Sequence, residues 1–277
     1  MTSTRPPSVS RKVFLRRRWL VGSAAVILLA ALIWALLVVL APAPPAIEPS
    51  ATPAGSGMVT PSPSPSPTPS PTSPPFDKAA HSIDDPMSIW VVADKLRPLQ
   101  PRDFYPSDLV TANVPYAANA TMRAEAATAL ERMFATAAAE GAGGMMVQNA
   151  FRPYDTQVGL YAGHVQRLGQ AQADIASARP GHSEHQTGLS ADIMPDNGQC
   201  GVTECFAQTS QGIWLAENAW RFGYHLRYPE GKTPITGYAF EPWHYRYIGV
   251  ALATELHQQG VTTLEEFFGL PPAPTYP

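Results

Sequence analysis

The amino-terminal part of the chain lacks charged residues over one stretch and aromatic residues over the next. Residues 19–41, WLVGSAAVILLAALIWALLVVLA, carry no charge. About 22 residues of helix, at about 1.5 Å each, are long enough to cross the hydrocarbon core of a bilayer. Six basic residues and no acidic residue precede this stretch. They predict a cytoplasmic tail (1–18), a single-pass transmembrane anchor (19–41) in the cell membrane and an extracytoplasmic remainder. A cleaved signal peptide is the alternative, although its apolar region is usually only 7–15 residues long.

Residues 42–75 contain no Lys, Arg or aromatic residue, and 13 of these 34 residues are proline. A segment of this composition cannot build a hydrophobic core and is expected to be a disordered, extended linker. In polyproline II geometry, at about 3.1 Å per residue, it would reach on the order of 100 Å from the membrane. The segment either serves as a spacer or carries sugars on its Ser and Thr residues, and its composition fits both.

Acidic residues are absent from residues 1–18 and outnumber basic residues thereafter. Beyond residue 18 the chain has 13 Lys and Arg against 22 Asp and Glu, a net charge of −9. We therefore expect no nucleic-acid partner. Cysteine is scarce as well, with only Cys200 and Cys205. An extracytoplasmic location favours a small disulfide loop between them, with free thiols or metal ligation as the alternatives.

Residues 76–277 contain no internal repeat and are predicted to form one extracytoplasmic domain, expected to be a monomer. Apolar residues at three- and four-residue spacings predict a helix over 122–137, with Thr121 as its N-cap. Helices mixed with non-adjacent strands indicate an α+β fold. The other predicted helices cover 154–168, 171–178 and 211–222, and the predicted strands cover 145–151, 189–194 and a segment that starts at 236.

The HExxH pattern of many zinc peptidases is absent, but two other polar clusters occur. In GHSEHQTGLSADI, residues 181–193, Asp192 stands between two apolar residues, seven positions after His185. Such a carboxylate is costly unless it is paired or bound to a metal. Together with His244 of EPWHYRY, the cluster offers two imidazoles and one carboxylate, the kind of ligand set found in catalytic zinc sites. Gly188 would let the backbone turn between ligands, and Glu241 is a candidate general base.

Each of these residues also has an ordinary structural explanation. Asp192 could cap a turn, EPWHYRY could be an aromatic core strand, and Arg152, at the end of a predicted strand, could form a surface ion pair. Spacing alone leaves the metal site and the structural roles equally open.

SEHQTGLSAD followed by EPWHYRY resembles the signature S-x-H-x-x-G-x-x-x-D … E-x-W-H of D-alanyl-D-alanine carboxypeptidases of the vancomycin-resistance carboxypeptidase type. These belong to the lysostaphin/D-Ala-D-Ala/hedgehog-like (LAS) zinc metallopeptidases. The resemblance covers roughly residues 89–250 and includes NAFRPYDTQ and RFGYHLRYPEGKTPITGYAFEPWHYRYIG. It implies a small antiparallel sheet flanked by helices. Phe151, Pro153 and Ser190 depart from the residues usual in the family, and the first two affect the expected substrate preference.

The resemblance also implies a role for each matching residue. It implies one Zn²⁺ per domain, although other divalent ions suit the same donors. The implied activity is removal of the terminal D-alanine from peptidoglycan stem peptides. Alternatives are an L,D-carboxypeptidase or an endopeptidase acting on the same peptides, and a non-catalytic domain that binds the cell wall. The implied roles are metal ligation by His185, Asp192 and His244, general-base catalysis by Glu241, stabilisation of the carbonyl oxygen by Arg152, and substrate contact by Ser183 and Gln157.

Overall fold

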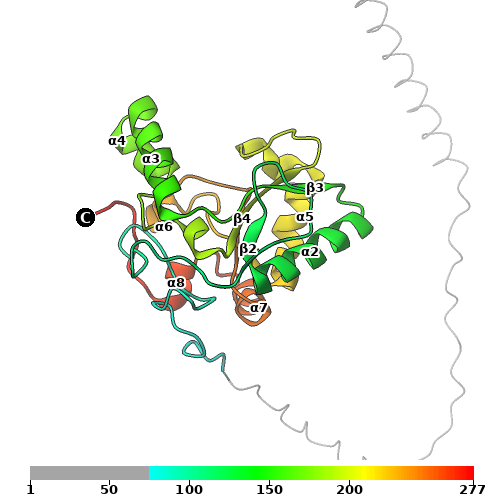
Figure 1. Ribbon diagram of the computed structural model, residues 1–277. Coiled ribbons are helices and arrows are strands. Elements are labelled where there is room, and N and C mark those ends of the chain that lie inside the picture. Colours follow the sequence, from blue (N-terminus) through cyan, green and yellow to red (C-terminus); the bar gives the residue numbers. More distant parts are fainter. Residues whose placement is uncertain (1–74) are drawn as a thin grey trace, which may run out of the picture. The chain divides into compact units, whose positions relative to one another are not determined.

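The computed structural model describes residues 75–277 (Figure 1). The predicted cytoplasmic tail, the predicted transmembrane anchor and all but the last residue of the predicted linker lie outside the described residues. Among residues 75–277, none of the helices combines the length and the hydropathy that crossing a membrane would require. Small antiparallel sheets and helices make up this part of the chain, which confirms the predicted α+β class.

A four-stranded antiparallel sheet with the strand order β3-β4-β6-β5 forms the centre of the domain. Strand β4 is buried at every residue because it has a neighbour on both sides and helices around it. A separate two-stranded antiparallel sheet, β1-β2, packs beside helix α2 (Figure 1). The strands are β1 (Leu109–Thr111), β2 (Thr121–Arg123), β3 (Met145–Asn149), β4 (Ser190–Pro195), β5 (Tyr224–Leu226) and β6 (His244–Tyr247).

The helices are short apart from α2 and α3, and α2 buries an apolar face in the core that includes the sheet. In α2 the buried residues recur at helical spacing, from Ala126 through Leu130 and Met133 to Ala137. A second apolar cluster, around Trp90, Ile248 and Phe267, holds α7 and α8 together. The helices are α2 (Ala124–Ala139), α3 (Tyr154–Leu168), α4 (Gln170–Ala176), α5 (Ser210–Asn218), α6 (Thr233–Thr236), α7 (Val250–Gln259) and α8 (Leu264–Phe268), with 3-10 turns η1 (Glu184–Thr187), η2 (Glu204–Gln208) and η3 (Ala219–Phe222).

Helices α3 and α4 project from the body of the domain as a pair (Figure 1). In α3 only Gln157 is buried, and in α4 only Ala173. Such a pair contributes little to the core, and its exposed side chains are available to contact a ligand.

Two sequence predictions about local structure are wrong. Thr121 does not cap α2, because it lies in β2 and pairs with Thr111, while Arg123 occupies the N-cap position. The strand predicted to start at residue 236 begins only at His244, because residue 236 ends α6 and Gly237 follows it in the left-handed conformation with φ of 80°. The predicted helix over 154–168 has the observed bounds of α3, and the helix predicted over 171–178 is shifted by one or two residues.

Candidate active site

The register of the central sheet brings Asp192 and His244 together. In the β4–β6 pair these two residues are directly opposite each other, so their Cβ atoms are about 5 Å apart on one face of the sheet. His185 comes from the 3-10 turn η1 that precedes β4. Oδ2 of Asp192 lies 3.2 Å from Nε2 of His185, and Oδ1 of Asp192 lies 3.2 Å from Nδ1 of His244. One ligand atom from each of the three residues lies within 4.8 Å of the others.

Gly188 makes the turn between His185 and β4 possible. Its φ of 70° is left-handed, a conformation that glycine adopts without steric cost. A Cβ atom at this position would also lie 2.9 Å from Cδ2 of Leu109 and 3.0 Å from Cγ of Arg123. The glycine expected from the sequence therefore serves both the backbone conformation and the close packing of β1 and β2.

The donor set of His185, Asp192 and His244 fits a divalent cation. Oδ1 of Asp192 is buried and accepts no hydrogen bond within the described part of the chain. Nδ1 of His185 donates to the carbonyl oxygen of Ala150 at 2.7 Å, which leaves the lone pair of Nε2 directed at Asp192. Two imidazole nitrogens and one carboxylate oxygen match the protein ligands of catalytic zinc sites.

The electrostatics of the cluster also favour a cation. Burial alone would lower the pKa of His244, but the carboxylates of Asp192 and Glu184 raise it to about 9. Burial would likewise raise the pKa of Asp192, but the imidazoles of His185 and His244 hold it well below its usual range. The pocket therefore stabilises positive charge at the point where the three side chains converge.

Glu241 and Arg152 flank this cluster. Oε2 of Glu241 lies 3.5 Å from Nδ1 of His244, and its side chain is only 15% exposed. Burial raises the pKa of Glu241 to about 7, in the range suited to a general base. Arg152 follows β3, and its backbone N–H donates to the carbonyl oxygen of His185 at 3.1 Å. Its guanidinium faces the same cavity as Glu241.

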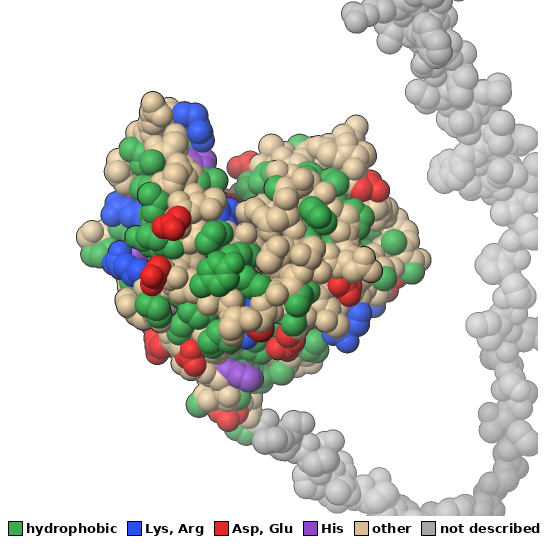
Figure 2. Space-filling model, viewed as in Figure 1, with side chains coloured by type: hydrophobic (Ala, Val, Ile, Leu, Met, Phe, Trp, Pro, Cys, Tyr) green, Lys and Arg blue, Asp and Glu red, His purple; other side chains and the backbone are tan. Residues whose placement is uncertain are grey.

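A cleft of about 650 Å³ contains the cluster. It is lined on one side by α3, through residues such as Leu160, and on the other by Val202 in the loop closed by the Cys200–Cys205 disulfide. Figure 2 shows the surface notched between the lobe that contains α3 and α4 and the rest of the domain. The cleft is open to solvent.

Comparisons with known proteins agree with this geometry. A profile of the VanY family, described as D-alanyl-D-alanine carboxypeptidase, matches residues 119–250. YodJ of Bacillus subtilis (strain 168), whose name marks it as a candidate carboxypeptidase, is 38% identical over 192 residues, which are 68% of this chain and 69% of YodJ. The structure of LdcB, described as an LD-carboxypeptidase, matches with a TM-score of 0.62 and 37% identity, over 66% of this chain and 87% of LdcB. A mutant of the D,D-pentapeptidase VanY from a VanB-type resistance cassette, in complex with Zn(II), matches with a TM-score of 0.55 and 30% identity, over 66% of this chain and 99% of VanY.

The chain belongs to the VanY family of D-alanyl-D-alanine carboxypeptidases. The resemblance read from SEHQTGLSAD and EPWHYRY is thereby confirmed. The family match includes every residue to which the sequence assigned a metal, base or oxyanion role.

The VanY-family domain places the two expected substrate contacts differently. Ser183 lines the cleft, and its Oγ accepts a hydrogen bond from Nη2 of Arg152 at 3.3 Å. Gln157 is fully buried, and its Oε1 accepts from Nε of Arg152 at 2.5 Å, while its amide nitrogen donates to Ala178 and Ser177. Gln157 therefore orients the guanidinium of Arg152 from its buried side and does not form part of the cleft surface.

Sequence reasoning missed Glu184, the residue between Ser183 and His185. Its side chain has no exposed area, and its Oε2 lies 3.5 Å from Nε2 of His244. Its Oε1 accepts from Nε of Arg227 at 2.8 Å and from Nη1 of Arg246 at 2.9 Å. Burial would raise the pKa of Glu184, but these two guanidinium groups hold it well below its usual range. In the sequence, the only indication of this role is that Glu184 directly precedes the candidate ligand His185 in the VanY-family motif.

Proposed function

We propose that this VanY-family domain is a zinc-dependent D,D-carboxypeptidase that removes the terminal D-alanine from peptidoglycan stem peptides. The observation that carries the proposal is the arrangement of Glu241 and Arg152 beside the cluster of His185, Asp192 and His244 in one cleft. A general base, a fixed cation and a metal-ligand set are the three components needed for hydrolysis of a peptide bond by an activated water.

In the proposed reaction His185, Asp192 and His244 hold the metal. When bound, zinc would act as a Lewis acid that lowers the pKa of a water to about 7 and polarises the scissile carbonyl. Glu241 accepts the proton of the attacking water and then delivers it to the nitrogen of the departing D-alanine. Arg152 donates hydrogen bonds to the carbonyl oxygen as negative charge develops on it. Gln157 and Ser183 keep the guanidinium oriented for this contact.

A second candidate is L,D-carboxypeptidase activity on the same stem peptides. LdcB, described as an LD-carboxypeptidase, has a higher TM-score with this chain than the VanY structure has. The catalytic groups serve either bond equally, so the choice depends on the walls of the cleft.

The test compares two peptides with the full-length chain loaded with zinc. We expect mass spectrometry to show release of D-alanine from a pentapeptide that ends in D-Ala-D-Ala, no shortening of the matching tetrapeptide, and loss of release in a chelator. Shortening of the tetrapeptide alone would support the L,D alternative. Binding of both peptides without release of any residue would contradict a hydrolase and favour a wall-binding domain.

We further propose that residues 19–41 anchor the chain in the cell membrane and that residues 42–75 extend the domain toward the cell wall. The basic tail, the uncharged stretch and the proline-rich composition support this arrangement. The Cys200–Cys205 disulfide also supports this arrangement, because disulfides form and persist in oxidising compartments outside the cytoplasm. Fractionation tests it: the full chain is expected in the membrane fraction and accessible to external protease, and deletion of residues 1–41 is expected to release it.

A further inference from the structure

The loop closed by Cys200 and Cys205 contains a backbone conformation that the proposed catalysis does not use. Val202 has a φ of 52° and Cys200 a φ of 55°. For a β-branched residue this left-handed conformation is an outlier, because its branched side chain crowds the backbone. Asn or Gly would adopt it at lower cost. The presence of valine therefore calls for a role that its side chain performs.

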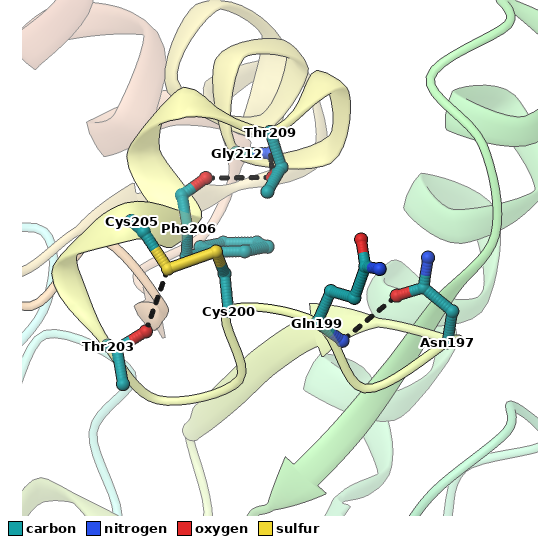
Figure 3. Close-up of a disulfide and its surroundings, with 8 residues drawn as sticks. All are labelled: Asn197, Gln199, Cys200, Thr203, Cys205, Phe206, Thr209 and Gly212. Carbon is teal, nitrogen blue, oxygen red and sulfur yellow. Dashed lines mark hydrogen bonds between the residues drawn. A yellow bond between two sulfur atoms is a disulfide. The ribbon is translucent and has the colours of Figure 1, made fainter. Parts of the chain in front are cut away.

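The surroundings of the loop hold Val202 in this conformation. The disulfide joins the two ends of the turn (Figure 3). Phe206, directly after the second cysteine, is fully buried and packs in the core. At the start of the loop, Oδ1 of Asn197 accepts a hydrogen bond from the backbone N–H of Gln199 at 2.9 Å. The disulfide closes the loop and Phe206 attaches its second end to the core, with Val202 between the two cysteines.

Val202 faces the catalytic cleft. It lines the same cavity as Arg152, Glu241 and His244 and is 39% exposed. Leu160 of α3 lines the same cavity and is 38% exposed. Leu160 belongs to α3 and Val202 to the disulfide loop, so the two apolar side chains reach the cavity from different segments of the chain. Each leaves apolar surface in contact with water that a bound apolar group would cover.

We infer that Val202 is a specificity-determining residue: together with Leu160 it contacts the alkyl side chain of a peptide residue upstream of the cleaved bond. The inference rests on the proposed function. The leaving amino acid is a single residue next to the metal ligands, whereas the upstream peptide must leave the site through the open part of the cleft. The partial exposure of Val202 and Leu160 places them in that open part.

The experiment uses the full-length chain loaded with zinc and two peptides that end in X-D-Ala-D-Ala, with X either L-norleucine or L-alanine. We expect the parent to favour norleucine roughly 3- to 10-fold in kcat/KM, since a few partly buried methylene groups contribute a factor of that size. V202N is expected to lose this preference through a higher KM for the norleucine peptide. Its Tm is expected to equal or exceed that of the parent, because Asn tolerates the left-handed conformation.

V250N is the matched control, because Val250 is 47% exposed and begins α7, away from the cleft lining. It is expected to keep the parental preference. A V202N variant that retains the preference would overturn the inference. If the parent hydrolyses neither peptide, the proposed function fails separately. Calorimetric affinities of the two peptides for parent and V202N then decide the role of Val202: a lost preference supports it, and an unchanged one overturns it.

Discussion

Oε2 of Glu184 lies 3.5 Å from Nε2 of His244, while Asp192 lies 3.2 Å from the other nitrogen of the same ring. The imidazole is thus held between two carboxylates. Ala150 plays the corresponding part for His185, by accepting a hydrogen bond from its Nδ1. Such partners fix which ring nitrogen is free to bind a metal and strengthen it as a ligand.

We predict that Glu184→Gln weakens zinc affinity about 10- to 100-fold, because an amide N–H facing Nε2 of His244 opposes the required tautomer. Both this variant and Glu265→Gln are expected to lower the free energy of unfolding by about 3 kcal/mol. Each removes one charge from the buried network in which Arg227 also pairs with Glu265 at 2.7 Å. Glu265→Gln is the matched control, since it leaves His244 untouched. The measurement is a zinc titration of both variants. Equal zinc affinities in the two variants would contradict the role of Glu184.

We predict that Glu241→Gln lowers kcat about 10²- to 10⁴-fold while the zinc content stays at the parental level, because Gln preserves the shape of the side chain but cannot accept the proton. The same substitution at the exposed Glu230 is the control.

Burial raises the pKa of Glu241 to about 7, and a base acts only when it is deprotonated. The parental kcat/KM should therefore rise with pH between about 6 and 8. A flat profile, or a Glu241→Gln variant with parental turnover, would contradict the assignment.

Arg152→Lys is expected to lower kcat about 10²- to 10³-fold, the usual effect of losing one donor to a developing oxyanion. Lysine retains the charge but not the planar pair of donors that Gln157 and Ser183 orient. Arg167→Lys, on the exposed part of α3, is the control for the same chemical change. Steady-state kinetics on the pentapeptide provides the measurement. Parental kcat in Arg152→Lys would show that charge alone is sufficient.

His225 should make the stability of the domain depend on pH. Nε2 of this residue is buried without a hydrogen-bond partner in residues 75–277, and burial lowers the pKa of the ring to about 4 from its ordinary 6.5. Between these pH values the unfolded chain binds the proton and the folded chain does not, so the free energy of unfolding falls as the pH drops from 6.5 to 4. A shift of this size corresponds to about 3 kcal/mol. Urea titrations should show a shallower decline for His225→Gln, and the parental decline for the same substitution at the exposed His81.

The sequence predicted the parts of the site that depend on local signals. The bounds of α3 and the turn at Gly188 follow from residue types within a few positions. The role of Glu184 could not be predicted, because its partners Arg227 and Arg246 lie 43 and 62 positions away and meet it only through the sheet. The wrong prediction that Thr121 caps a helix has the same cause. Thr121 pairs with Thr111 across the β1–β2 sheet, and the local sequence pattern does not reveal this pairing.

Gln157 is the only residue of α3 that is buried, and this has a consequence for how such enzymes diverge. Substitutions at exposed helical positions usually change stability by less than about 0.5 kcal/mol. Mutations can therefore accumulate along this helix over evolutionary time without unfolding the protein, while the buried ligand strands tolerate almost none. We expect new preferences for the bond cleaved to arise by drift in the exposed walls of the cleft, of which α3 is one, with the hydrolytic chemistry inherited unchanged.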